Sequence, residues 1–278
     1  MTVLEFTGVV AIVSFVSGFL GSLTGLGGGV VLVPLLTLLF HVDIRYAIGA
    51  SLVSVIATSS GAAAAYVKEG YTNVRIGMLL EVGTTFGALF GAFISAYIAP
   101  NFIAVLFGAV LLFSSYLSVR ERKDEHHDLP PDPIATKLRL SGSYPTKDGW
   151  QKYSVRGVPG GFSLMFGAGV LSALLGIGSG GIKVLAMDQI MRIPFKVSTT
   201  TSNFMIGVTA AASAGVYLSR GYIDPALAMP VTLGVLIGSM VGARVLGGAK
   251  ISVLRKVFAI VLCLVAIEMI YKGLTGKI

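Results

Sequence analysis

Two glycine-rich stretches in the sequence have the composition of a backbone site for an anion. The first, GLGGG, covers residues 25–29, and the second, GIGSGG, covers residues 176–181. Because glycine has no Cβ, such stretches adopt conformations closed to other residues and let backbone N–H groups face a ligand. Each precedes a short apolar segment, and the free N–H groups at a helix start favour negative charge. An oxyanion site is one interpretation, and close packing between helices is the other.

A lysine follows the second stretch only. Lys183 lies inside an apolar segment, where a cation is costly unless it meets water, a counter-charge or a ligand. A bound oxyanion would supply the counter-charge. An ion pair with Asp188 or Glu81, or a side chain that reaches the membrane interface, is the alternative.

Hydroxyl side chains follow each short segment, near the start of the next long one. Ser51 and Ser202 are the strongest candidates, because they match each other in the internal repeat described below. Such side chains can hydrogen-bond an oxyanion, although they also cap helices and pack between them. The predicted substrate-binding residues are Gly25, Gly27, Gly28, Gly29, Ser51, Gly176, Gly178, Ser179, Gly180, Gly181, Lys183, Thr201, Ser202 and Asn203.

Two carboxylates lie within long apolar runs, toward their ends. Glu81 and Glu268 are therefore candidates to carry a coupling proton. A carboxylate that is paired or faces the interface is the competing interpretation.

The sequence lacks the motifs that metal sites, nucleotide-binding sites and catalytic sites require. The three histidines and the single cysteine, Cys263, have no metal-ligand spacing, and the chain has no Walker loop and no nucleophile elbow. We therefore expect no metal, no cofactor and no enzymatic activity.

The composition is that of a membrane protein. The 278 residues are 54% hydrophobic and only 12% charged, with a mean hydropathy of +0.85. The apolar runs are long enough for helices that span a lipid bilayer, and they lack the alternation of a barrel. The net charge of +8 comes mostly from Lys and Arg residues in loops, where cytoplasmic positive charge sets the orientation of the helices in the membrane. We therefore expect no nucleic acid partner.

The chain repeats itself at an offset of 151 residues. Aligning 18–91 with 169–242 pairs eight glycines with glycines, where chance gives roughly one. The predicted organisation is a first transmembrane repeat (1–119), a cytoplasmic hydrophilic linker loop (120–156) and a second transmembrane repeat (157–278). Each repeat has five elements, of which the second holds only about 12 residues: 3–24, 29–40, 46–66, 73–98 and 101–119, then 157–175, 180–191, 197–218, 223–246 and 253–271.

The basic residues indicate how the halves are oriented. If the linker is cytoplasmic and the first two elements of each half leave and return to one side, 16 of the 21 Lys and Arg residues are inside. Four then lie outside: Arg45, Arg220, Lys272 and Lys277. Halves with an odd number of crossings must be inverted relative to each other. The predicted fold is an all-α polytopic membrane protein, an inverted repeat with short or broken helices at glycine-rich turns.

The motifs resemble those of the TauE/SafE family of sulfite exporters. In each half a G-[LI]-G-x-G turn is followed by VVLVPLL or IKVLAMD, a loop with a basic residue, and GAS or TTS. Ser179 and Leu185 depart from the family's usual glycine and proline. The resemblance implies transport of sulfite, an organosulfonate such as sulfoacetate, or thiosulfate across the inner membrane of a bacterium. Another small solute, or a cation, is the alternative cargo, and a homodimer is an arrangement we consider.

Overall fold

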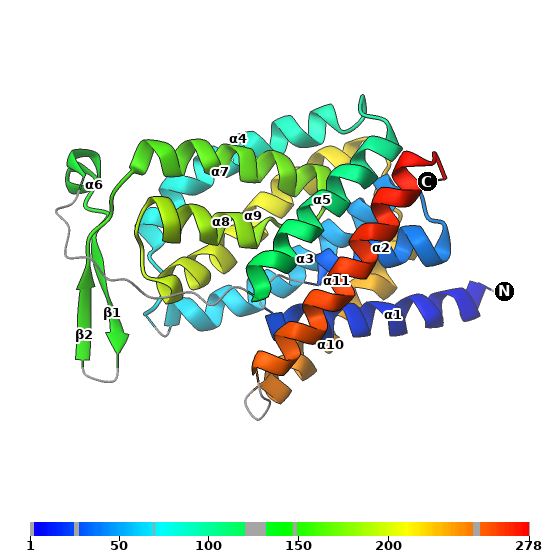
Figure 1. Cartoon of the computed structure of the whole chain (residues 1–278), viewed down its shortest axis with the longest axis horizontal. Helices are drawn as coiled ribbons and strands as arrows, with labels where there is room; N and C mark the ends of the chain where they lie inside the picture. Colours follow the sequence, from blue (N-terminus) through cyan, green and yellow to red (C-terminus); the bar gives the residue numbers. More distant parts are fainter. Residues whose placement is uncertain are drawn as a thin grey trace.

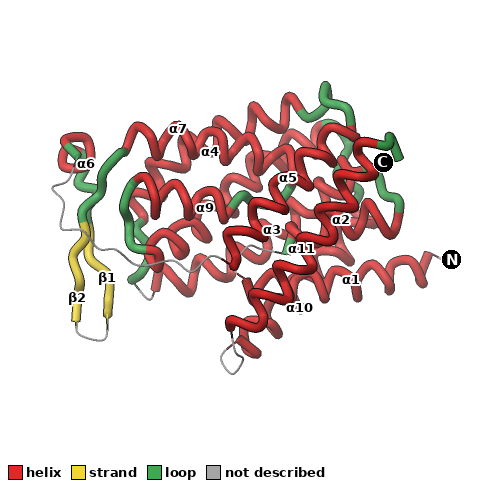
Figure 2. Tube along the Cα trace, viewed as in Figure 1, coloured by secondary structure: helices red, strands yellow, loops and turns green. Residues whose placement is uncertain are grey.

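The computed structural model describes residues 3–24, 28–68, 70–119, 132–146, 149–246 and 251–277. The chain is mainly helical in these ranges (Figure 1; Figure 2). The first half contains α1 (Val3–Thr24), α2 (Gly29–Phe40), α3 (Ile44–Lys68), α4 (Val74–Ile94) and α5 (Pro100–Val119). The second half contains α7 (Val158–Leu175), α8 (Gly180–Leu185), the π-helix η1 (Ala186–Ile190), α9 (Phe195–Ser219), α10 (Pro225–Leu246) and α11 (Ile251–Leu274). The second short element thus changes to π geometry after six residues.

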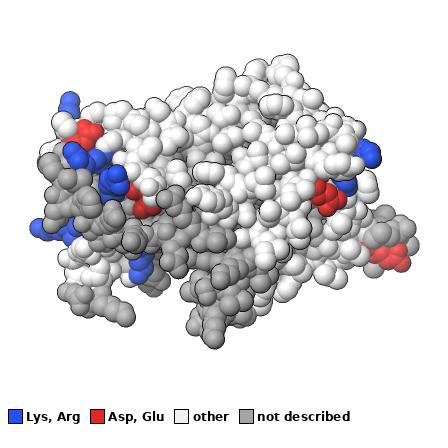
Figure 3. Space-filling model, viewed as in Figure 1, with Lys and Arg blue, Asp and Glu red and all other residues white. Residues whose placement is uncertain are grey.

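The helices carry the apolar outer surface expected of a bilayer protein. By length and composition, α4, α7 and residues 225–242 of α10 can each cross a membrane, and four shorter apolar stretches lie in α1, α2, α3 and α5. On α4, for example, Phe86, Phe90 and Phe93 point outward. On the face drawn in Figure 3, the described charged side chains lie at the two ends of the long axis, and the described residues between them are uncharged. This is the distribution expected of helices in lipid.

The linker contains regular structure that the sequence did not predict. Its described part forms α6 (Pro133–Lys137) and an antiparallel hairpin of β1 (Gly142–Thr146) and β2 (Gly149–Tyr153). Buried residues of this segment pack against the ends of α4, η1 and α9. The amide Nδ2 of Asn73 donates to the carbonyl of Leu140 at 3.0 Å and to the Tyr153 hydroxyl at 2.7 Å. The apolar residues of the segment are too widely spaced to show a periodic pattern.

The first two helices of each half return to the end from which they start. In the first half, the rings of Phe6 and Phe40 meet with centroids 5.6 Å apart. In the second half, the Arg156 N–H donates to the Met191 carbonyl at 3.1 Å. Figure 1 shows the linker at one end of the bundle, the linker end, and both termini at the other, the terminal end. The first pair therefore starts and finishes at the terminal end, and the second pair at the linker end.

Glycines bring helices of opposite halves into backbone contact. A Cβ on Gly169 of α7 would overlap the carbonyl of Thr84 in α4, and one on Gly18 of α1 would overlap that of Val235 in α10. The two contacts are equivalent, because the offset of 151 residues relates Gly18 to Gly169 and Thr84 to Val235. The same holds for Gly87 against Phe166 with Gly238 against Phe15, and for Gly83 against Phe162 with Gly234 against Ala11. Each half thus pairs with the other through equivalent positions.

Two cation–aromatic contacts also occupy matching positions. The ammonium of Lys196 lies 3.8 Å from the ring centroid of Tyr71, at the linker end. The guanidinium carbon of Arg45 lies 5.7 Å from the ring centroid of Tyr222, at the terminal end. Each contact joins the start of one long helix, α3 or α9, to the loop that follows the other.

The backbone contact of α7 with α4 predicts that alanine substitutions at two nearby glycines of α7 have different effects on stability. Gly169→Ala should lower the unfolding temperature in detergent, because overpacking costs about 1–3 kcal/mol. Gly167→Ala on the same helix is the matched control, since a Cβ there meets nothing within 4 Å. Equal unfolding temperatures for the two variants would contradict this packing.

Candidate functional site

The two glycine-rich turns meet inside the bundle. Gly28 precedes α2 and Gly29 begins it, and a Cβ on Gly29 would lie 2.5 Å from Ser51 Oγ and 2.8 Å from the carbonyl oxygen of Gly176. Gly29 belongs to the first turn and Gly176 to the second. The structure therefore brings one turn from each half into contact, although Gly25 and Gly27 lie outside the described residues.

The second turn needs left-handed backbone at three positions. Gly176 and Gly178 have φ of +66° and +68°, and Ser179, which precedes α8, has φ of +47°. Glycine adopts these angles without steric cost, whereas serine does so with strain. Ser179 Oγ is buried and has no hydrogen-bond partner among the described residues. Gly180 and Gly181 follow as the first residues of α8, so their N–H groups have no acceptor within that helix.

The repeat-matched serines bond to the turns. Ser51 Oγ donates to the Gly176 carbonyl at 2.7 Å, across the two halves, and Ser202 Oγ donates to the Gly180 carbonyl at 3.3 Å. Both serines are buried. Thr201 points elsewhere, because its hydroxyl accepts the Asn73 N–H at the start of α4 at 3.0 Å. Asn203 is half-buried on the same helix as Ser202.

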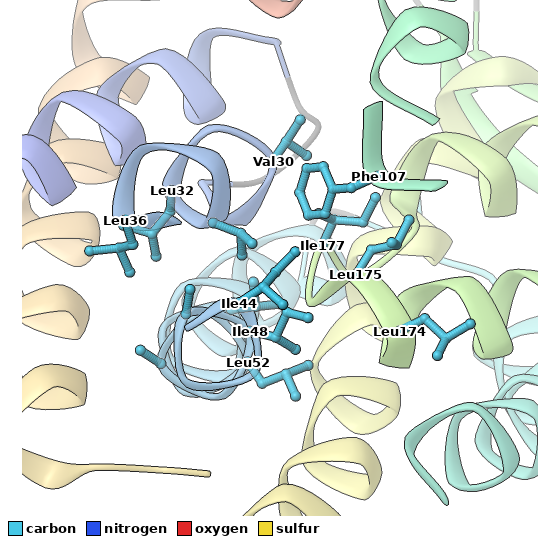
Figure 4. Close-up of a cluster of buried hydrophobic side chains, with 14 of the residues drawn as sticks. Val30, Leu32, Leu36, Ile44, Ile48, Leu52, Phe107, Leu174, Leu175 and Ile177 are labelled. Carbon is cyan, nitrogen blue, oxygen red and sulfur yellow. The ribbon is translucent and has the colours of Figure 1, made fainter. Parts of the chain in front are cut away.

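Apolar side chains surround the junction of the turns. Figure 4 shows Ile177 of the second turn among a cluster that includes Val30, Ile48 and Phe107. Such a lining excludes water and leaves the backbone and the serines as the polar groups at the junction.

Lys183 is connected to Glu81 through a threonine. The lysine is fully buried, and its Nζ donates to Thr209 Oγ1 at 2.6 Å. The Thr209 hydroxyl lies 2.7 Å from Glu81 Oε1 and 3.0 Å from the Met205 carbonyl, the two acceptors available to it. Thr85 donates to the same Glu81 oxygen at 3.2 Å. Because Lys183 and Glu81 share one hydroxyl, their charges lie within about 5 Å of each other and attract strongly in this buried setting.

Three elements hold this polar group, here called the buried relay: Lys183 from α8, Thr209 from α9 and Glu81 from α4. Glu81 is only 6% exposed, and its Oε2 has no hydrogen-bond partner among the described residues. Thr209 was not among the predicted site residues. The repeat pairs it with Thr58, but the sequence does not reveal that a carboxylate of the other half lies beside it.

Glu268 lies apart from the turns. Its side chain is 54% exposed on α11, and its Oε1 is 3.6 Å from the Lys272 ammonium. Lys272 also donates to the Leu38 carbonyl at the terminal end. In the described part of the chain, no three His, Cys, Asp or Glu side chains gather as metal ligands would.

Comparison with known proteins identifies the family. Residues 10–269 match the family described as sulfite exporter TauE/SafE. The chain belongs to this family of membrane transporters. It is 28% identical over 273 residues to the probable membrane transporter protein YunE of Bacillus subtilis, covering 96% of this chain and 98% of the relative. YdhB of the same organism, also described as a probable membrane transporter protein, is 26% identical over 237 residues, covering 85% and 89%. No solved structure gives a significant match.

These findings test two predictions about this TauE/SafE member, its family and its general architecture. The family assignment is confirmed, and the helical, multi-pass character agrees with a membrane transporter. The names of the relatives state neither a substrate nor a direction.

The buried relay predicts that loss of the Thr209 hydroxyl lowers the stability of the protein more than loss of the hydroxyl of Thr58, its repeat equivalent. Thr209→Val keeps the shape but leaves Lys183 and Glu81 without their shared partner, which costs about 1–3 kcal/mol per unsatisfied buried group. Thr58→Val is the matched control, because Thr58 bonds only to carbonyls of its own helix in the described structure. Thermal unfolding in detergent measures the difference, and equal losses in the two variants would contradict the relay.

Proposed function

We propose that this transporter carries a small sulfur oxyanion, sulfite or a related organosulfonate or thiosulfate, out of the cell across a bacterial inner membrane. The anion binds where the two glycine-rich turns meet. The supporting observation is the contact of Gly29 with Ser51 and Gly176, because a site shared by both halves can be exposed to either side.

The groups at the junction suit an oxyanion. N–H groups of both turns supply neutral donors, and Lys183 on α8 adds a buried positive charge. Ser51 and Ser202 add hydroxyls, whose protons turn from the carbonyls of Gly176 and Gly180 toward the anion when it binds. Thr201 and Asn203 follow on α9 and would join the lining if that helix turns during transport. Of the two candidate coupling carboxylates, Glu81 is the one next to Lys183.

The arrangement of the halves supports an inverted repeat. The two short-helix pairs start from opposite ends of the bundle, and the glycine contacts recur after exchange of the halves. Inverted halves give alternating access when the two halves exchange conformations, because a two-fold axis in the membrane plane relates the inward-open and outward-open states. Both cation–aromatic contacts are formed in this structure, and in this proposal that of Lys196 with Tyr71 opens to give access at the linker end and that of Arg45 with Tyr222 opens to give access at the terminal end.

The runner-up is a carrier of another small anion or neutral solute. A cation carrier is less well supported, because such a site needs several carboxylates or carbonyls facing the ligand, whereas Glu81 is already beside Lys183. A binding panel of sulfite, thiosulfate, sulfoacetate and taurine on the purified protein distinguishes these cargoes.

Removal of the buried charge tests the proposed site. Lys183→Met should lower sulfite flux in proteoliposomes by about tenfold or more, because charge-assisted hydrogen bonds to an anion are the strong ones. Gly29→Ala should reduce flux as well, since its Cβ would press on Ser51 and Gly176.

Lys152→Met is the matched control for the lysine, because it removes one positive charge from the exposed strand β2. It should retain normal flux. The proposal fails if Lys183→Met, reconstituted in folded form, transports sulfite as fast as the Lys152 variant does.

A further inference from the structure

The buried relay holds one basic and one acidic side chain away from water. Lys183 is fully buried and Glu81 nearly so, and the described residues include no other ionisable side chain bonded to either. With both groups ionised the relay is electrically neutral. A neutral pair is the arrangement that a low-dielectric interior tolerates best.

Both side chains have unused hydrogen-bonding capacity. An ammonium has three donors, and within the described residues Lys183 uses one, toward Thr209. Glu81 Oε2 is buried without a partner there, although a carboxylate oxygen normally accepts hydrogen bonds. The lysine can therefore bind a further acceptor, and the carboxylate can take a proton at Oε2.

An anion that bound to Lys183 would upset the charge balance. The site would then hold two negative charges and one positive charge, with the anion and Glu81 repelling each other across a few ångströms of apolar interior. Protonation of Glu81 removes the excess and restores neutrality for a singly charged anion. Binding of the anion is therefore favoured when Glu81 is neutral.

We propose that Glu81 takes up one proton at Oε2 whenever an oxyanion binds to Lys183, so that the transporter moves anion and proton together. This rests on the proposed function, and it assigns the coupling ion to that site. Thr209 is the positioning residue, since its hydroxyl holds the ammonium and the carboxylate against each other.

The neighbouring helices offer no competing titratable group close to Glu81. Helix α7, which packs along α4, carries none, and α9 carries Lys196 and Tyr217 toward its two ends. Lys196 lies over the Tyr71 ring at the linker end, and the Tyr217 hydroxyl donates to the Ala173 carbonyl. Arg75, on α4 itself, is exposed and donates to the Arg139 carbonyl. Asp188 lies on η1, beyond α8, and accepts from Gln189.

The coupling determines how transport responds to gradients. A single negative charge that moves with one proton carries no net charge, so the membrane potential neither drives nor opposes it. The direction then follows the combined gradients of the anion and the proton: export requires an outward anion gradient larger than any inward proton gradient, and a larger inward proton gradient drives uptake.

The test compares the pH dependence of sulfite binding in the wild type and in Glu81→Gln, whose amide imitates the protonated acid. Sulfite titrates near neutrality, so each dissociation constant varies with pH for that reason alone. The ratio of the wild-type constant to the E81Q constant removes this contribution, because the ligand is the same in both.

We expect a ratio near one at acidic pH. It should rise by up to about tenfold per pH unit where Glu81 of the wild type becomes ionised, since one proton is linked to binding. In proteoliposomes, an inward proton gradient should increase sulfite accumulation by the wild type more than by E81Q. A ratio that stays constant over the pH range, with wild-type binding intact, would overturn the inference and leave the proposed function standing.

A second variant keeps the test decisive if E81Q fails to fold. Thr209→Val removes the hydroxyl that holds the lysine and the carboxylate against each other, so its sulfite affinity should vary less with pH than that of Thr58→Val, which keeps the relay. The same pH profile for both threonine variants would overturn the inference. If the wild type binds no sulfite, thiosulfate or sulfonate at any pH, the proposed function fails and the coupling fails with it.

Discussion

The contact between the two glycine-rich turns is the constraint on which the rest of the structure depends. Unwound backbone inside an apolar bundle must find polar partners, because no water reaches it. Ser51 satisfies the Gly176 carbonyl from the opposite half, and it fits only because Gly29 beside it has no side chain. The short helices, the serines on α3 and α9, and the apolar lining in Figure 4 are all arranged around this contact.

The two repeats that form the junction differ in their residues at the positions of the buried relay. The repeat equivalents of Lys183, Thr209 and Glu81 are Leu32, Thr58 and Thr232. The symmetric framework thus supplies two equivalent locations, and only one of them carries ionised side chains. The two halves therefore differ in chemistry at positions where their backbones are equivalent.

Much of the fold could be predicted, because it follows from local patterns. Apolar runs and glycine spacing located α2 at 29–40 and the α7–α8 turn to within a residue, and the offset of 151 anticipated equivalent elements. The contacts between Lys183, Thr209 and Glu81 join residues far apart in sequence, so only their packing reveals which of two acidic partners the lysine meets. The linker's small helix and hairpin escaped prediction for a similar reason: Ala135, Leu140 and Val155 become a core only against the ends of the membrane helices.

The glycine contacts determine which parts can move as units. Between α1 and α10, and between α4 and α7, backbone lies directly on backbone, so these pairs have no layer of side chains that could rearrange as they slide. Each pair contains one helix from each half of the chain. The packing units of this fold therefore differ from its two sequence repeats: each unit combines helices of both halves, and the contact between α3 and α9 also joins the two halves.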